Sequence, residues 1–386
     1  MERTRAIPGL LRDLNERTVL DLIRASAPIS RAEISRRAGI SKPTVSLALR
    51  SLVDGGLVRE TSQVPGRPTY GAVYFEPVPE AALVLGFDLG AQFLRGALSD
   101  LRGDVRARQD VEVAGLDAGA IVDSARALYM SLLKASRLPA ELVDGAVAGV
   151  PGVVSSDRGP IALPGDIPGL GDRDLGSELE ERLGLAVTLE NDVNLAALGE
   201  QWRGVAQDVD DFVFLSIGTG LGAGIVLDGR LHRGRHGAAG ELDYSRAGRP
   251  DETDPSADAI SAFAARLAQG DESALEQAYD TRSIFAAARA GDGVARAVVE
   301  ETARRIALHV VPVAATVDVS LVVLGGGIGA NGDLLLEPVR RLLAAWLPFP
   351  PWVEVSMLGD SAVLTGALAT GLRAANESVF TRRARA

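Results

Sequence analysis

The sequence of 386 residues contains no cysteine and no long uninterrupted apolar run. The lack of cysteine excludes disulfide bonds and thiolate zinc sites, and it is compatible with the reducing cytoplasm, where we expect the protein to act. The most apolar stretch, residues 310–330, is broken by Asp318 and ends in glycines, so it predicts a buried helix and a strand rather than a membrane span. Charges in every turn of residues 1–20 exclude the apolar core of a signal peptide.

Charge is distributed unevenly along a chain whose length predicts two or three domains. The formal net charge is -11, but residues 1–70 carry +5 and the other 316 residues carry -16. This asymmetry is typical of a head that binds nucleic acid, followed by a body that repels phosphate. Hydrophobic residues make up 47% and charged residues 24%, an ordinary composition for a folded protein.

The first forty residues have the pattern of two helices. Apolar residues on one helical face predict a first helix over residues 10–25: they are Val19, Leu20 and Ile23. Ser30 is followed three residues later by Glu33, which is the spacing of a capping box and predicts the start of a second helix. Gly39 can end that helix in a left-handed conformation.

A third helix is predicted to begin at Ser41, which is a good N-cap residue, and its inner face carries Val45, Leu49 and Leu52. Short capped helices in this order predict a helix–turn–helix whose third helix enters the major groove. Leu47 on the outer face can only contact thymine methyl groups or pack. The residues expected to contact DNA from this helix are Ser41, Lys42, Pro43, Thr44, Ser46, Leu47 and Arg50.

A wing follows the third helix. The segments "GLVRET" and "TYGAVYFEP" alternate like two strands, and "SQVPGRP" joins them with Arg67 near its tip. A short loop that carries arginine suits the minor groove, where the negative potential is strong. The alternative is a three-helix bundle that contacts proteins, but the positive charge and the basic wing favour DNA.

The body contains two similar glycine hairpins, over residues 83–105 and 213–234, whose spacing suggests a duplicated lobe. Each reads as a strand, a glycine-rich turn and a second strand, and such turns place backbone N–H groups beside a bound anion. A third glycine cluster, "LVVLGGGIGANG", follows a strand and opens a helix. Strand–glycine–helix junctions suit phosphates or nucleosides, although one alone is weak evidence.

Between the hairpins, "VTLENDVNLAALGE" places Asn191 and Asp192 at the tip of a strand, before a helix. An amide beside a carboxylate is a good hydroxyl-binding pair, and Asp192 is also placed to act as a general base. The alternative is that one of the two simply caps the helix. Glu241, in "AAGELDY", follows a flexible turn and is either a further site residue or an acid on a surface loop.

Taken together, these segments resemble the ROK family of sugar kinases and sugar-responsive repressors. The resemblance rests on "FDLG", "GVPGVV", "ENDVNLAALGE", "GTGLGAGIVLDGRLHRGRHGAAGE" and "VLGGGIG" in the family's order, over residues 82–375. It implies an actin-like, ribonuclease-H-like body, and the head in front resembles the family's repressor branch. The sugar site that the resemblance implies contains Gly152, Asn191, Asp192 and Glu241, with Asp192 at the position of the kinase base. The implied phosphate loops contain Asp88, Gly90, Gly218, Thr219, Gly220, Gly325 and Gly326.

The chain departs from the family's pattern in its first phosphate loop and in its sugar site. Ala91 and Gln92 stand where the kinases have glycine and threonine, which speaks against ATP binding and catalysis. The amide that the kinases often carry against the sugar is absent, because Gly165 occupies its position. The polar pocket is therefore smaller than that of the kinases.

The family's zinc ligands are absent as well. Tyr244 replaces the zinc-binding histidine beside the sugar site, and residues 245–259, where the family has cysteines, contain none. His232 and His236 lie four residues apart in a glycine-rich segment and are better explained as solvated loop residues than as a replacement site. We expect no zinc and no other cofactor, with Tyr244 lining the ligand pocket.

The predicted fold is therefore α/β, with a winged helix–turn–helix over residues 1–76, a linker over 77–80, a two-lobed body over 81–375 and a tail over 376–386. The predicted function is a DNA-binding transcriptional regulator, a repressor, that senses a sugar or sugar-phosphate effector and assembles as a homodimer or tetramer. Two alternatives remain open: a sugar kinase with a fused head, and a DNA-binding protein whose body is a ligand-free scaffold. Neither the operator nor the effector can be read from the residues.

Overall fold

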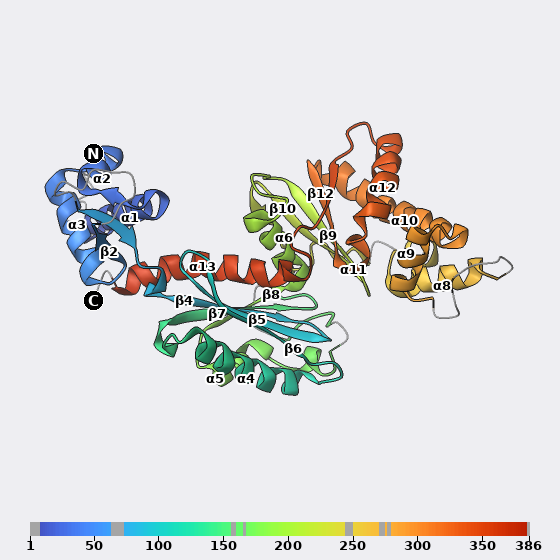
Figure 1. Ribbon diagram of the computed structural model, residues 1–386, viewed down its shortest axis with the longest axis horizontal. Helices are drawn as coiled ribbons and strands as arrows, with labels where there is room; N and C mark the ends of the chain where they lie inside the picture. The colour runs from blue at the N-terminus through green and yellow to red at the C-terminus, as the bar shows by residue number, and fades with distance from the viewer. Residues whose placement is uncertain are drawn as a thin grey trace.

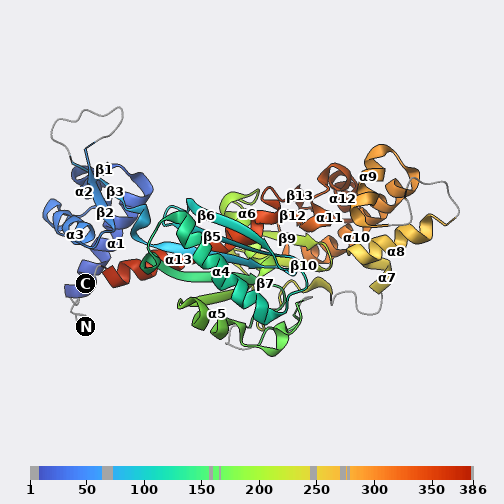
Figure 2. The same cartoon turned by 60° about the horizontal axis from the view of Figure 1, so that its bottom comes forward.

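The computed structural model describes residues 8–62, 73–155, 160–164, 167–243, 250–269, 275 and 279–383. A small head lies at one end of an elongated molecule, and two lobes, each built on a five-stranded sheet, form the remainder (Figures 1 and 2). One long helix, α13, runs from between the lobes to the head (Figure 1). The expected α/β architecture, with a winged helix–turn–helix ahead of a two-lobed body, is confirmed. No helix in the described ranges is long and apolar enough to cross a membrane.

The head has three helices, α1 (Pro8–Ser26), α2 (Arg31–Ala38) and α3 (Lys42–Asp54), and a small sheet in the order β1-β3-β2. Ser30 and Ser41 cap α2 and α3 through their side chains, and Gly39 ends α2 in the left-handed conformation, as predicted. The strands are β1 (Ile29–Ser30), β2 (Val58–Thr61) and β3 (Tyr74–Pro77). The wing tip, with Arg67, lies outside the described residues.

The first lobe is a sheet in the order β6-β5-β4-β7-β8, in which β4, β7 and β8 run parallel. Helices α4 and α5 cover one face and α13 the other (Figure 1). The elements are β4 (Leu83–Leu89), β5 (Phe93–Asp100), β6 (Val105–Glu112), α4 (Ala118–Ser136), β7 (Val143–Val150), α5 (Leu175–Leu183) and β8 (Val187–Asn191). The central strands β4 and β7 are apolar and largely buried, because helices cover both faces of the sheet.

The second lobe follows helix α6 (Asp192–Arg203) and has the sheet order β11-β10-β9-β12-β13. Its strands are β9 (Phe212–Ile217), β10 (Leu221–Leu227), β11 (Arg230–Leu231), β12 (Leu321–Gly325) and β13 (Trp352–Val355). Its helices are α7 (Pro250–Thr253), α8 (Ala257–Leu267), α9 (Thr281–Ala290), α10 (Gly293–Val317), α11 (Gly326–Gly329) and α12 (Gly332–Trp346). Short 3-10 helices lie at Pro79–Ala81, Ala140–Leu142, Leu170–Asp172 and Gly359–Ser361.

Helix α13 (Ala362–Arg383) is where the structure differs from the expected domain boundaries. Residues 376–383 continue this helix instead of forming a tail, because Val379 and Phe380 find apolar partners in the core of the head. The guanidinium of Arg17 on α1 also lies over the Phe380 ring, 5.4 Å from its centroid. The C-terminal turns of the chain therefore belong to the head in packing, although they follow the body in sequence.

Candidate DNA-binding face and effector site

The outer face of α3 presents the residues expected to contact DNA. Lys42, Pro43 and Arg50 are exposed, and Leu47 has 65% of its surface exposed, whereas Val45, Leu49 and Leu52 are buried. The exposed Leu47 is therefore free to contact a partner of α3, although single exposed leucines also occur elsewhere in the described chain, as at Leu11 and Leu14. This arrangement fits a recognition helix, and contact with DNA by the individual side chains stays a prediction.

Hydrogen bonds hold the two ends of this face in place. The Ser41 hydroxyl accepts from the Thr44 N–H at 3.3 Å and lies 2.8 Å from the Thr44 hydroxyl, while the Ser46 hydroxyl donates to the Lys42 carbonyl at 2.9 Å. Arg31 of α2 donates to the Ser46 hydroxyl at 3.2 Å. Arg31 was not predicted as part of this face, because its place in the first turn of α2 is its only signal in the sequence.

In the body, the candidate effector site lies at the carboxyl ends of the parallel strands of the first lobe. Asp88 of β4 pairs in register with Gly149 of β7, and Gly149 pairs with Glu190 of β8. Since the chain leaves the sheet at these ends, three segments that are far apart in sequence meet at one edge. This edge carries acidic side chains on the two strands that flank β7, namely Asp88 on β4 and Glu190 on β8.

Asn191 caps helix α6, which was the alternative to a role in hydroxyl binding. Its Oδ1 accepts from the Asn194 N–H at 2.9 Å at the start of α6, and its Nδ2 donates to the Gly152 carbonyl at 3.1 Å. Gly152 has a φ of +108°, and a Cβ there would lie 2.7 Å from the Leu163 carbonyl oxygen, so only glycine fits. Asn191 therefore fixes the loop after β7 against α6, and most of its amide is already occupied.

Asp192 is the acidic centre of the site. Burial, with repulsion from Asp88 and Glu241, raises its pKa to about 7, and the Val193 N–H, which donates at 2.8 Å, opposes the rise. Burial also raises the pKa of Glu241, with a smaller contribution from Asp243. The structure thus brings Asp88, Asp192 and Glu241 into one electrostatic cluster. Such a cluster of acceptors, poised to ionise near neutral pH, suits sugar hydroxyls or a proton transfer.

Asp88 is neutralised by a residue that the sequence did not single out. The Arg95 Nη1 atom of β5 lies 3.0 Å from the Asp88 Oδ2, and Arg95 also approaches Asp110 at 3.6 Å and Asp360 at 3.8 Å. Burial nevertheless raises the pKa of Asp88 to about 6. The turn between β4 and β5, with Ala91 and Gln92 exposed, is closed by the Gly90 N–H, which donates to the Phe93 carbonyl at 3.0 Å.

The two glycine clusters of the second lobe meet at the ends of β9 and β12. A Cβ on Gly326 would lie 2.4 Å from the Ile217 carbonyl oxygen, which shows how closely the two backbones approach. The Gly218 N–H donates to the Gly220 carbonyl at 3.0 Å, and the Gly218 carbonyl accepts from the Ala257 N–H at 2.8 Å. The predicted second phosphate loop is therefore a tight turn with Thr219 exposed beside it.

An ion pair joins the first lobe to the segment after β11. The Arg233 Nε atom lies 2.6 Å from the Glu190 Oε2, and the Glu190 Oε1 accepts from the Asn194 side chain at 3.0 Å. Glu190 is buried and therefore needs such a partner. The sequence indicated Glu190 only as the end of a strand, and no spacing in the sequence linked it to Arg233.

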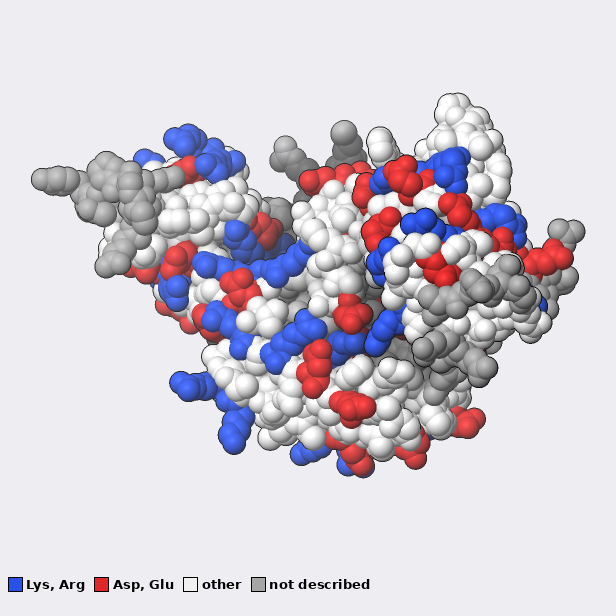
Figure 3. Space-filling model, turned by 45° about the vertical axis from the view of Figure 1, so that its right-hand side comes forward, with Lys and Arg blue, Asp and Glu red and all other residues white. Residues whose placement is uncertain are grey.

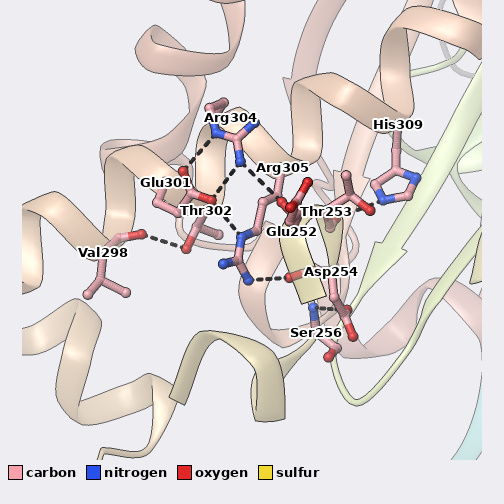
Figure 4. A network of polar contacts seen from close by, with 10 residues as sticks. All are labelled: Glu252, Thr253, Asp254, Ser256, Val298, Glu301, Thr302, Arg304, Arg305 and His309. Atoms are coloured by element: carbon pink, nitrogen blue, oxygen red, sulfur yellow. Dashed lines mark hydrogen bonds and ion pairs between the residues drawn. The ribbon is translucent and has the colours of Figure 1, made fainter. Parts of the chain in front are cut away.

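Side chains of α10 bind the backbone of the segment around α7 (Figure 4). Arg305, buried to 3% exposure, donates to Glu301 at 2.9 Å and to the Asp254 carbonyl at 2.7 Å. Arg304 donates to the Glu252 carbonyl at 3.1 Å, and the His309 Nε2 lies 3.0 Å from the Thr253 carbonyl oxygen. These contacts hold the segment that leads to the Ala257–Gly218 hydrogen bond.

The residues considered for metal or ligand contacts differ in whether the structure describes them. His232 and His236 are both exposed. No group of three or more metal-binding side chains occurs among the described residues. Tyr244 and Gly165 lie outside the described residues. The expected lack of zinc and the contribution of Tyr244 to the pocket remain predictions.

Comparison with known proteins tests the family assignment. The model of the ROK family matches residues 84–373, three quarters of the chain. The chain belongs to the ROK family. A MarR family model also matches residues 13–68 of this ROK protein, in agreement with a winged helix–turn–helix head.

Relatives of both kinds resemble this ROK protein. It is 28% identical to the xylose repressor of Caldicellulosiruptor bescii, over 93% of this chain and 96% of that protein. It is 30% identical to the glucokinase of Halalkalibacterium halodurans, over 68% of this chain and 85% of the glucokinase. Its structure matches the crystal structure of a ROK family transcriptional regulator, a homologue of the E. coli MLC protein, with a TM-score of 0.76, 26% identity, and coverage of 97% and 99% of the two chains. The glucokinase alignment covers about two thirds of this chain, whereas those of the two regulators cover more than nine tenths of it and therefore extend into the head.

Proposed function

We propose that this ROK protein is a DNA-binding transcriptional repressor whose body binds a small polyhydroxylated effector, a sugar or sugar phosphate. The observation that carries the effector part is the cluster of Asp192, Asp88 and Glu241, in which burial raises the pKa of Asp192 to about 7. The head, with its exposed recognition helix, supports the DNA part, and similarity to a regulator over nearly the whole chain supports their combination. A homodimer is the simplest assembly, since two heads match a two-fold symmetric operator.

Phosphoryl transfer is not part of the proposal. Transfer requires phosphate to be held in line with the acceptor hydroxyl, and positioning supplies most of the catalysis. Here the Arg95 guanidinium lies 3.0 Å from the Asp88 carboxylate, and Ala91 and Gln92 replace the loop residues that hold phosphate in kinases of the family. A carboxylate already paired with arginine is a poor ligand for a magnesium ion that would accompany ATP.

The proposed mechanism couples the effector site to the head through two helices. Asp192 is the first residue of α6, α6 packs against α13, and α13 ends in the core of the head. An effector that prefers one arrangement of the lobes would move α6, and with it α13 and the head. Operator affinity would then change through a shift in population between two states.

The deciding experiment selects operator sequences from a random duplex library and measures release of the selected duplex by a panel of pentoses, hexoses and their phosphates. We expect at least one sugar to weaken operator binding by tenfold or more, about 1.4 kcal/mol. Asp192→Asn should abolish this response while leaving operator affinity in the absence of sugar unchanged. Asp208→Asn, on an exposed turn, is the matched control. Absence of any sequence preference would contradict the repressor, and lack of response to the whole panel would favour a ligand-free scaffold.

A sugar kinase is the second candidate. It is favoured by Asp192, whose pKa of about 7 suits a general base, and by the tight turn of Gly218 and Gly220. A coupled assay with ATP and the same sugars tests it. Turnover that Asp192→Asn removes and Asp208→Asn retains would establish a kinase and overturn the assignment of the body as a sensor only.

A further inference from the structure

A pocket lies where the head, the linker, the first lobe and α13 meet. It has a volume of about 450 Å³ and is lined by Arg24 of α1, Leu57, Val78 of the linker, Leu101 and Arg102 after β5, and Asn376 of α13. Pockets of this size accommodate small metabolites, and they occur preferentially between domains. We call it the junction pocket. It is distinct from the site at Asp192, with which it shares no residue.

Arg24 is an incompletely neutralised cation in the wall of the junction pocket. Its side chain is only 25% exposed, and the ion pair it makes within the described ranges is a long one, 3.7 Å, to Asp21, whose own side chain is 62% exposed. Burial lowers the pKa of Arg24, and the nearby Arg17 lowers it further, while Asp21 only partly compensates. Such a guanidinium is stabilised by an anion brought to it from solution.

Two further polar side chains line the junction pocket together with Arg24. The guanidinium of Arg102 belongs to the turn after β5, is exposed, and makes no ion pair with the described part of the chain. The Oδ1 atom of Asn376 is buried and has no hydrogen-bond partner among the described residues. An orphaned amide oxygen is costly to bury and is satisfied by a hydroxyl or a water. Figure 3 shows basic side chains in a band where the head meets the body.

We propose that the junction pocket binds a small phosphorylated polyol, such as a sugar phosphate. Arg24 and Arg102 would bind the phosphate, since planar guanidinium groups donate pairs of hydrogen bonds to its oxygens. The Asn376 Oδ1 would accept a hydrogen bond from a hydroxyl of the same ligand, and Leu57, Val78 and Leu101 supply the apolar walls.

The position of the junction pocket gives this site a regulatory consequence. A ligand there touches α1 of the head, the turn after β5 of the body, and α13 at once. It would favour one orientation of the head relative to the body, and so change the spacing of two heads on an operator. The inference does not depend on effector binding at Asp192.

The test is calorimetric titration of the full chain with glucose 6-phosphate, inorganic phosphate and glucose, in phosphate-free buffer and in an Asp192→Ala background that removes the first site. We expect glucose 6-phosphate to bind, inorganic phosphate to bind more weakly, and glucose not to bind. Arg24→Gln and Arg102→Gln should each weaken glucose 6-phosphate binding by about tenfold or more, as loss of a charge-assisted contact predicts. Arg24→Lys, which keeps the charge, should restore part of the affinity that Arg24→Gln loses. Arg126→Gln, which changes an exposed residue of α4, is the control.

Three results would overturn the proposal. One is that no phosphate compound binds at millimolar concentration. Another is binding that Arg24→Gln and Arg102→Gln leave unchanged. The third is that these variants lose affinity for a short DNA duplex and not for glucose 6-phosphate, which would assign both arginines to the DNA backbone. Because Arg102 is exposed, Arg102→Gln should fold normally and keeps the test valid even if Arg24→Gln is unstable.

Discussion

A Cβ atom on Gly366 would lie 1.8 Å from the carbonyl oxygen of Leu195, so the backbones of α13 and α6 touch at this crossing. Gly199 repeats the contact from the other side, where a Cβ would lie 2.3 Å from the Ala362 carbonyl oxygen. Interiors packed this closely transmit displacement with little compression. The crossing is therefore the point at which a movement of α6, which begins at Asp192, would reach the helix that ends in the head.

Gly366→Ala should force the two helices apart. We expect lower thermal stability, because overpacking typically costs about 1–3 kcal/mol, and a weaker coupling of effector binding to operator release. Melting temperature and sugar-induced release of the operator measure the two effects. Gly293→Ala is the matched control, since a Cβ at Gly293 meets no atom within 4 Å. An unchanged effector response in Gly366→Ala would contradict transmission through this crossing.

Asp192 should make both stability and effector affinity depend on pH. Its folded pKa of about 7 lies above the ordinary aspartate value of 3.8, so the folded state binds more protons than the unfolded state between these values, and stability falls as pH rises through that window. Asp192→Asn removes this titration and should gain stability relative to the natural chain, by up to about 2 kcal/mol at pH 8 and little at pH 4.

The same titration sets the expected pH profile of effector binding. A protonated Asp192 loses its acceptor strength, so sugar affinity should rise mainly between pH 6 and pH 8, with its midpoint near the Asp192 pKa of about 7. Asp88 and Glu241 titrate in both proteins, so the difference between the natural chain and Asp192→Asn isolates Asp192. Denaturant unfolding and sugar titration at four pH values supply the data, and a stability difference independent of pH would contradict a raised pKa of Asp192 in the folded protein.

Lys42 and Arg50 should separate affinity from sequence preference on DNA. Lys42→Ala, at the exposed start of α3, is expected to weaken binding to all duplexes and to reduce the salt dependence by about one phosphate contact. Arg50→Ala is expected to cost about 1–3 kcal/mol on the selected operator and less on other duplexes. Fluorescence anisotropy at several salt concentrations tests both. Equal losses on operator and random duplexes for Arg50→Ala would remove it from base recognition.

Arg305 and Arg304 offer a matched pair for the network of α10. Arg305→Met removes the hydrogen bonds that this buried guanidinium donates to Glu301 and to the Asp254 carbonyl, and we expect the free energy of unfolding to fall by about 2–4 kcal/mol. Arg304→Met, whose side chain is 41% exposed, should cost less than about 1 kcal/mol. Denaturant unfolding of the two variants decides the matter, and equal costs would show that burial of Arg305 is not what stabilises the segment.

Chelation should leave this protein unchanged. Because the sequence has no cysteine and carries Tyr244 in place of the family's histidine, we expect EDTA to alter neither melting temperature nor operator affinity. Elemental analysis of untagged protein provides the independent measurement. Zinc at one equivalent per chain would show that other residues have taken over the site.

The sequence by itself determined the local elements of the head, because their signals are local. Ser30, Gly39 and Ser41 act on the helix ends beside them, and the apolar spacing of Val45, Leu49 and Leu52 defines the buried face of α3 whatever surrounds it. The motifs of the body also allowed the family and the two-lobed fold to be predicted. Order and spacing of glycine turns survive in a sequence even where their ligands have changed.

Only the tertiary structure decided which of the predicted site residues have their side chains available. Asn191 is held by the Gly152 carbonyl, 39 residues away in sequence, and Asp88 is paired with Arg95 across a β-hairpin. Beside them, Glu190 is paired with Arg233, 43 residues away. The same holds for residues 376–383, whose charged and apolar residues alone resemble a loose tail. Val379 and Phe380 are buried only because α13 is long enough to bring them to the head, and long-range packing of this kind leaves no local pattern.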